Sequence, residues 1–385
     1  EILETVLTQR KIVKKQMKAL DPSSTMYSVA NGKQLALKVV ANSIYGFTGA
    51  TFGFLPEKRI AESVTKFGRY MITQTKDYIE NHPTYGRNGS GIECIYGDTD
   101  SVFLTIPTSL VSGKTVEERM TNAHAFGEKL GKDVNRIFLP PNDLEYEKSY
   151  ASFLLLKKKR YAGFKYEPGL PPKLQVKGIE CARRDYAPML VETQKKMLNM
   201  LLLERDVKKA CDYVAAVADD LQNGRIELQK IIMSKKLSRA PCEYKAMAAH
   251  VNLALRMEKE DPTKAPVAGD RVDYVIAQGN SSKVSENAVL PSEIKSGKRV
   301  VDTRYYMEKQ LKAPLLRILK FVVEKPEKLF VTTHIVKSSR NSLGFSPVAG
   351  SSGSGRSRKR PAVCVKRKRT KVQTLNDIFR FKKKA

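Results

Sequence analysis

The feature that most constrains the fold is the segment Tyr96–Ser101, which lies between two apolar, strand-like runs at 92–95 and 102–106. Its sequence, Tyr-Gly-Asp-Thr-Asp-Ser, predicts an antiparallel hairpin that carries Asp98 and Asp100 on its rim and not in a core. Two carboxylates at this spacing can converge on one point, where a hard divalent cation is the usual partner. The alternative is an ordinary Asp-rich turn, and the rest of the chain has to decide between them.

Charge and cysteine usage narrow the class of protein. The 385 residues carry a net charge of +29, and residues 351–385 are especially rich in Lys and Arg, although the rest of the chain is basic as well. Such an excess of positive charge favours a polyanionic partner such as nucleic acid. The five cysteines are scattered without a C-x-x-C pair, which argues against a zinc module or a disulfide framework and favours a reducing compartment.

Two further expectations follow from the length of the apolar runs and from the first residues of the chain. No apolar run reaches the roughly 18 residues of a membrane span, so no membrane partner is expected. The chain opens inside a helical pattern without a Met. We therefore expect it to be the later part of a longer protein.

The first segment predicts two helices, at 1–20 and at about 35–45, separated by the break Asp21–Ser24. Lys38, Asn42 and Tyr45 follow one another at i, i+4 and i+7, so they share a helix face. Two antiparallel helices would direct Arg10, Lys14 and Lys38 toward one anion, with the amide of Asn42 and the phenol of Tyr45 beside it. Two solvated basic faces are an equally good interpretation.

The middle of the chain mixes helix and strand patterns without a regular β-α repeat. Helices are predicted at about 60–79 and 115–138, and strands at 92–106, 144–148, 152–156, 161–166 and 174–179. This order is typical of an α+β fold with helices on one face of a sheet. Residues 188–340 predict a separate, mainly helical domain with a short strand in 269–276.

Three clusters of cations interrupt these elements. The run 157–161 places four cations before Tyr161. Arg183 and Arg184 follow shortly after, and the segment 231–239 contributes Lys235 and Lys236. These clusters suit contacts with duplex phosphates or the minor groove. The alternative for the first cluster is a solvated strand end.

Order is expected to fail after about residue 342. A Gly/Ser-rich stretch at 350–356 predicts a flexible linker. It leads to basic clusters at 358–360 and 366–369, which indicate nuclear import or plain attraction to nucleic acid. Leu375, Ile378 and Phe379 form one apolar face of a single helical turn, which predicts a docking peptide.

Together these motifs resemble the family B DNA polymerases, in particular the delta-type replicative enzymes and their relatives in large DNA viruses. Residues 38–49 look like the fingers motif of the family, 96–101 like its catalytic palm motif, and 158–161 like its duplex-sensing motif. Their order and approximate spacing also match, and the likeness covers about residues 1–340. Three motifs in register are far more specific than one.

The resemblance implies a right-hand polymerase with α+β architecture. Residues 1–46 would be part of the fingers, 47–187 the palm, 188–341 a mainly helical thumb, and 342–385 a flexible basic tail. The implied reaction is template-directed DNA synthesis, in which two Mg²⁺ ions assist transfer of a nucleotide from a dNTP to a primer 3′-hydroxyl.

The resemblance also assigns roles to residues. The metal site would hold Asp98 and Asp100, with Glu147 as a further acidic group. The dNTP would bind Arg10, Lys14, Lys38, Asn42 and Tyr45. Primer–template DNA would contact Gly46, Lys158, Lys159, Arg160, Tyr161, Arg183, Arg184, Lys235 and Lys236. A sliding clamp would bind Leu375, Ile378 and Phe379, in a box that lacks the usual leading Gln.

Departures from the family pattern lead to further expectations. The first palm motif, with another metal-binding aspartate, would lie before residue 1, so the chain alone is expected not to polymerise although the full-length protein would. The carboxy-terminal cysteine modules of cellular delta-type enzymes are missing, which fits a viral enzyme. We expect a nuclear location or a viral replication compartment. A non-catalytic nucleic-acid-binding module is the main alternative, and an RNA-copying enzyme is a third.

Overall fold

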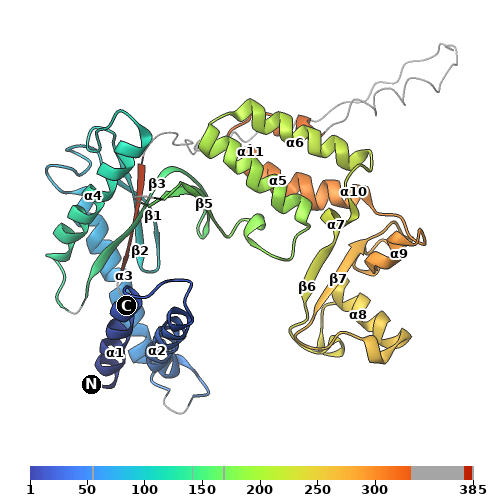
Figure 1. Cartoon of the computed structure of the whole chain (residues 1–385), viewed down its shortest axis with the longest axis horizontal. Coiled ribbons are helices and arrows are strands. Elements are labelled where there is room, and N and C mark those ends of the chain that lie inside the picture. The colour runs from blue at the N-terminus through green and yellow to red at the C-terminus, as the bar shows by residue number, and fades with distance from the viewer. Residues whose placement is uncertain (54–55, 141, 168–169, 331–376, 384–385) are drawn as a thin grey trace, which may run out of the picture. The chain divides into compact units, whose positions relative to one another are not determined.

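The computed structural model describes residues 1–53, 56–140, 142–167, 170–330 and 377–383. These residues belong to two compact units, each of which is discontinuous in the chain (Figure 1). Among the described residues, the first unit comprises those of Glu1–Thr105, Gly127–Glu147 and 379–383, and the second comprises those of Ile106–Phe126, 148–330 and 377–378. Both combine helices with antiparallel strands, so the predicted α+β class is confirmed.

The first unit begins with three helices. They are α1 (Ile2–Met17), α2 (Thr25–Gly49) and α3 (Lys58–Glu80), and α2 packs against both α1 and α3 (Figure 1). The second helix was expected from about residue 35, but α2 begins ten residues earlier. The reason is local, because the hydroxyl of Ser24 accepts a hydrogen bond from the backbone N–H of Tyr27 at 3.1 Å and caps the helix there.

The predicted aspartate hairpin is confirmed. Strands β1 (Glu93–Asp98) and β2 (Ser101–Ile106) pair in antiparallel fashion, with Asp98 opposite Ser101. Every residue of β2 is buried, which explains why its sequence is mostly apolar and does not alternate between apolar and polar residues. Helix α4 (Val116–Asn135) follows, and β3 (Leu144–Lys157) comes next. The two predicted runs at 144–148 and 152–156 are thus one strand with a bulge between Tyr150 and Ser152.

The last strand differs from expectation. Within the first unit the strand order is β1-β2-β9-β3, where β9 is Asp377–Lys383. Ile378 and Phe379 therefore lie in a strand and not in a helical turn, while Leu375 lies outside the described residues, as does nearly all of the predicted tail. An isolated helical turn is unfavourable because its nucleation is costly, whereas a strand between two others pairs its backbone groups.

The second unit continues β3 into the order β3-β4-β5 and adds a three-stranded sheet, β6-β7-β8. Its core draws mainly on the helices and strands that follow residue 188, together with a few residues before it such as Leu154 and Ala162. One short strand was expected near residue 270, but that strand, β7, pairs with two further strands, β6 and β8. The strands are β4 (Arg160–Tyr166), β5 (Lys173–Lys177), β6 (Met233–Lys236), β7 (Arg271–Ile276) and β8 (Ala288–Val289). The α-helices are α5 (Pro188–Asn199), α6 (Val207–Gln222), α7 (Leu228–Ile231), α8 (Ala249–Glu260), α9 (Pro291–Lys295), α10 (Thr303–Tyr305) and α11 (Ala313–Leu319).

Shorter helical turns complete the second unit. Two of them, η2 (Met200–Glu204) and η6 (Tyr306–Lys312), are π-helical and directly extend α5 and α10. The 3₁₀ turns are η1 (Glu180–Ala182), η3 (Pro241–Glu243), η4 (Pro262–Lys264), η5 (Val284–Glu286) and η7 (Pro326–Phe330). Across the described residues of both units, no helix is long and apolar enough to cross a membrane.

Close packing at β4 gives a first prediction. A Cβ on Gly163 would lie 2.8 Å from Cδ1 of Tyr150 and 2.9 Å from Cδ2 of Phe153. Gly163→Ala should therefore lower the free energy of unfolding by about 1–3 kcal/mol, because the ring atoms must move. Urea denaturation measures the change.

A matched control is Gly68→Ala within α3, where a Cβ meets nothing within 4 Å. This variant should raise the free energy of unfolding by up to about 1 kcal/mol through helix propensity alone. Equal stability of Gly163→Ala and the parent chain would contradict the packing argument.

Candidate functional site

The turn between β1 and β2 brings the two aspartates of the hairpin together. The backbone N–H of Asp100 donates to the carbonyl oxygen of Asp98 at 2.6 Å, and Thr99 between them has a φ of +54°. An i to i+2 hydrogen bond across a residue with positive φ is the strained form of the γ-turn, and a β-branched residue is rare there. Such strain is typical of functional sites.

Local hydrogen bonds orient both carboxylates. The hydroxyl of Thr99 donates to Oδ1 of Asp98 at 3.3 Å, and the hydroxyl of Ser101 donates to Oδ1 of Asp100 at 3.0 Å. Both aspartates are half-buried. The turn therefore presents hard oxygen ligands in a partly desolvated place, which suits Mg²⁺.

The third predicted metal ligand is not gathered with this pair. Glu147 is an exposed residue of β3. Among the described residues there is no group of three or more His, Cys, Asp or Glu side chains that could hold a metal ion. The geometry thus supports Asp98 and Asp100, and the role of Glu147 stays a prediction.

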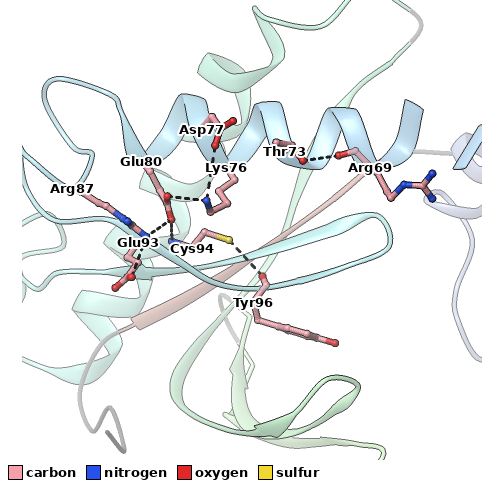
Figure 2. Close-up of polar contacts among 9 residues, drawn as sticks. All are labelled: Arg69, Thr73, Lys76, Asp77, Glu80, Arg87, Glu93, Cys94 and Tyr96. Atoms are coloured by element: carbon pink, nitrogen blue, oxygen red, sulfur yellow. Dashed lines mark hydrogen bonds and ion pairs between the residues drawn. The ribbon is translucent and has the colours of Figure 1, made fainter. Parts of the chain in front are cut away.

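A buried carboxylate connects α3 with the start of β1 (Figure 2). Glu80 is only 7% exposed and accepts hydrogen bonds from the backbone N–H of Cys94 and from Nη2 of Arg87, both at 3.0 Å. Nζ of Lys76 lies 3.3 Å from the same carboxylate. The contacts join the end of α3 to the strand that leads to Asp98. The sequence analysis missed Glu80, and its only signal was a charged residue at the end of an apolar helix stripe.

The thiol beside this carboxylate is a structural donor. Burial, followed by the charge of Glu80, raises the pKa of Cys94 to about 11, so the thiol stays protonated at neutral pH. Its Sγ lies 3.8 Å from the carbonyl oxygen of Tyr96, to which it donates (Figure 2). Cys94 is therefore part of the packing behind the hairpin and is not a nucleophile at neutral pH.

The residues predicted to bind a triphosphate lie on α1 and α2. Arg10 and Lys14 belong to α1, whereas Lys38, Asn42, Tyr45 and Gly46 belong to α2. These two helices pack against each other, and most of these side chains are exposed. Nε of Arg10 is buried and has no hydrogen-bond partner among the described residues, so the exposed cations Lys14 and Lys38 are the accessible ones of this set.

The predicted duplex-sensing motif forms the tip of the β3–β4 hairpin. Lys157 pairs with Arg160 across the two strands, and Lys158 and Lys159 make the turn, with a φ of +62° at Lys159. Both turn lysines are exposed. Arg160 instead points inward to Glu180, and Tyr161 is only 4% exposed. The structure thus favours a packing role for the last two residues of the motif.

The remaining predicted cations lie together in the second unit, although about fifty residues separate them in the chain. Arg183, Arg184, Lys235 and Lys236 line one cleft of about 520 Å³, which is called the basic cleft below. The other residues of the basic cleft are Asp185, Ser238, Tyr244, His250 and Arg271. The cleft gathers five Lys and Arg residues and suits a polyanion.

Arg271 is the cation of the basic cleft that was not predicted from the sequence. Its Nη2 donates to the carbonyl oxygens of Ser234 at 2.6 Å and Arg184 at 3.2 Å, so it joins the segments that carry the other cations. Residues 269–276 were predicted to contain a strand, but only the pairing of Lys236 with Arg271 across β6 and β7 shows that this arginine lies beside the cleft.

The positive charges in the basic cleft come from arginine and lysine, and Asp185 opposes them with one negative charge. A two-fold hydrogen bond from Arg183 lowers the pKa of Asp185, and Nε and Nη2 of Arg183 lie 2.9 and 2.8 Å from its two oxygens. Burial, followed by the charge of Lys235, lowers the pKa of His250. His250 is therefore neutral at pH 7 and adds no charge to the cleft.

Comparison with known proteins shows the family of the chain. The family model described as DNA polymerase family B matches residues 1–322. The chain belongs to this family. It is 40% identical over 338 residues to the DNA polymerase delta catalytic subunit of Caenorhabditis elegans, covering 86% of this chain and 30% of that protein. The corresponding subunit of Drosophila melanogaster is 42% identical over 323 residues, covering 83% of this chain and 28% of that protein.

A solved structure gives the same result for the fold. The family B DNA polymerase from the hyperthermophilic archaeon Pyrobaculum calidifontis matches with a TM-score of 0.51 and 29% sequence identity, over 84% of this chain and 38% of that one. The chain spans about 30% of the length of the curated relatives it matches. The relatives named here are cellular enzymes, and the viral origin that was expected from the tail is not shown.

The Glu80 contacts give a second prediction. Glu80→Ala leaves the half-exposed cations Arg87 and Lys76 and the backbone N–H of Cys94 without this acceptor. It should lower the free energy of unfolding by about 1–3 kcal/mol, because the N–H of Cys94 loses its acceptor while water solvates the two exposed cations. Thermal or urea unfolding measures the loss.

Glu62→Ala on the same helix is the matched control, because its ion pair with Lys58 is on the surface. It should change stability by less than about 1 kcal/mol. If the two variants lose the same stability, Glu80 does not hold β1 to α3.

Proposed function

We propose that this chain is the later part of the catalytic region of a replicative DNA-directed DNA polymerase. The observation that carries the proposal is the strained hairpin with Asp98 and Asp100 at its tip, in a chain of DNA polymerase family B. A binding module would not need a costly backbone conformation between two carboxylates. The reaction is transfer of a nucleotide from a dNTP to the primer 3′-hydroxyl.

The motif order supports a division into the parts of a right hand. Residues 1–46 are proposed as part of the fingers, 47–187 as the palm and 188–341 as the thumb. Similarity to a solved family B polymerase over 84% of the chain supports this division.

Asp98 and Asp100 fit a metal site by their donor chemistry. When bound, two Mg²⁺ ions would lower the pKa of the primer 3′-hydroxyl and neutralise charge on the phosphates. The hydroxyls of Thr99 and Ser101 orient the two carboxylates for this role. Glu147 is proposed as an accessory acidic group. Two carboxylates are few for such a site, which supports the expectation that this chain alone does not polymerise.

The helix pair α1–α2 is proposed to hold the dNTP. Arg10, Lys14 and Lys38 would neutralise the triphosphate, because phosphoryl transfer depends mainly on positioning and charge. The amide of Asn42 would donate a hydrogen bond beside them. Tyr45 and Gly46 would border the new base pair. The exposure of Lys14 and Lys38 supports this assignment.

Two surfaces are proposed to hold primer–template DNA. Lys158 and Lys159 at the hairpin tip would contact the minor groove, whose acceptors are similar in all correct pairs. The basic cleft with Lys235 and Lys236 would bind backbone phosphates. Arg160 and Tyr161 would support the hairpin from within.

The tail is proposed to bind a sliding clamp through Leu375, Ile378 and Phe379. Its basic clusters would direct the protein to the nucleus or to a viral replication compartment. Placement of Ile378 and Phe379 in β9 means that clamp binding would require this segment to leave the sheet.

The function is tested by Asp100→Asn in the full-length protein. Primer extension with Mg²⁺ and the four deoxynucleotides should fall by more than about 100-fold, because even indirect metal partners typically cost 10–100-fold. Affinity for primer–template DNA should stay unchanged. Asp212→Asn, an exposed aspartate of α6, is the control and should keep full activity.

The alternative, a non-catalytic nucleic-acid-binding module, predicts a different result. The full-length parent protein would then show no extension while binding DNA tightly and in a salt-sensitive manner. The same assay on this chain alone tests whether it is incompetent by itself, since Mg²⁺-dependent incorporation by the isolated chain would contradict that expectation.

Lys235→Ala combined with Lys236→Ala tests the basic cleft. If each lysine neutralises one duplex phosphate, the slope of log K against log salt should become less negative by up to about 1.8, since each contact contributes about 0.9. Fluorescence anisotropy with duplex DNA at several salt concentrations measures the slope.

The matched control replaces Lys208 and Lys259, two exposed lysines of the same unit that do not line the cleft. Its slope should stay close to that of the parent protein. An equal change in both double variants would reduce the cleft to general surface charge.

A further inference from the structure

One carboxylate in the second unit holds together four separate elements. Glu180 in η1 is only 4% exposed. It forms an ion pair with Arg160 of β4, and its Oε1 lies 2.9 Å from Nη2 of Arg317 in α11. Its Oε2 accepts a hydrogen bond of 3.1 Å from Nε2 of Gln194 in α5. Each partner comes from a different part of the chain, and Arg317 follows 137 residues after Glu180.

This carboxylate is ionised in the fold. Burial by itself would raise the pKa of Glu180, but hydrogen bonds from Gln194 and Arg160 and the charge of Arg317 outweigh burial, and the pKa is lowered. A buried carboxylate stays charged only when such partners are present.

The segment 178–180, which carries Glu180, supports the Lys158–Lys159 turn of the β3–β4 hairpin. Gly178 has a φ of +67°, and a Cβ there would collide with the carbonyl oxygen of Lys159. Arg160, which pairs with Glu180, directly follows Lys159. The turn is thus supported through its backbone at Gly178 and through a side chain at Glu180. Lys159 itself has a φ of +62°, a conformation that persists only when its surroundings impose it.

The same segment also contacts the helices that follow it in the chain. The backbone N–H of Cys181 donates to Oε1 of Gln194 at 2.8 Å, so Gln194 bonds to both Glu180 and its neighbour. Arg183 and Arg184 of the basic cleft follow within four residues. Glu180 therefore lies at the junction of the hairpin, the helices α5 and α11, and the start of the cleft.

We propose that Glu180 is a positioning residue that couples the Lys158–Lys159 turn to α5 and α11, so that the placement of these helices sets how well the turn distinguishes matched from mispaired duplex. The inference rests on the proposed function of the hairpin. Glu180 touches neither substrate nor metal, and it acts through Arg160 and Arg317. Loss of the link should change mismatch discrimination more than it changes the chemical step.

The test uses Glu180→Gln and Arg317→Met in the full-length protein. Both should lower the ratio of matched to mispaired primer extension by about tenfold, the effect of one charge-assisted hydrogen bond. The kcat on matched primer at saturating DNA should stay within about twofold of the parent value. Arg317→Met keeps the pair between Glu180 and Arg160, so it remains informative if Glu180→Gln fails to fold.

Arg225→Met is the matched control. It removes an exposed arginine that pairs with Asp219 and Asp220 in the same unit, and it should leave the ratio unchanged. A lower unfolding temperature with an unchanged ratio in both test variants would make Glu180 a purely structural residue and overturn the inference.

Lys159→Ala distinguishes failure of the proposed hairpin function from failure of the proposed coupling through Glu180. If it leaves the ratio unchanged, the proposed role of the hairpin fails, and the coupling loses its basis. If it lowers the ratio while Glu180→Gln and Arg317→Met do not, only the coupling is wrong. In the expected case, adding Arg317→Met to Lys159→Ala causes little further loss, because coupled residues are not additive.

Discussion

The candidate site depends on a backbone conformation that the chain would not adopt by itself. Thr99 is β-branched, and its φ of +54° costs roughly 1–3 kcal/mol. The conformation persists because the surrounding structure imposes it: β2 is buried along its whole length, and β1 is held to α3 by Glu80. With both strands in place, the turn has to close in two residues, and both carboxylates lie at its tip.

Buried glutamates serve the same purpose in both units. Glu80 and Glu180 are each less than one-tenth exposed, and each is paired with two cations. Burying such a carboxylate without a partner would lower the stability of the fold, because the charge loses its hydration. Once it is paired with cations, it connects elements that lie far apart in the chain. Glu80 supports the strand that leads to Asp98, and Glu180 supports the hairpin that exposes Lys159. In both cases a buried glutamate with two cationic partners supports a turn that carries polar side chains.

Prediction from the sequence was accurate for local features and weaker for contacts between distant segments. The β1–β2 hairpin, the amphipathic helix α3 and the α+β class follow from periodicity and turn chemistry, which act over a few residues. Helix α2 was predicted too short because capping by Ser24 was overlooked. Arg160 was treated as a solvent-facing cation, since nothing near it in the chain indicates that Glu180 is its partner. Arg271 was missed for the same reason, because its neighbours come from other strands.

The sequence by itself determined which residues can do the chemistry: two aspartates in a tight turn, cations on one helix face, and lysines at a hairpin tip. These patterns are local, so spacing alone identifies them. Only the tertiary structure decided which charged groups are exposed and which are buried, and which distant cations share a cleft. Desolvation and pairing depend on elements brought together by folding, and no local pattern specifies them.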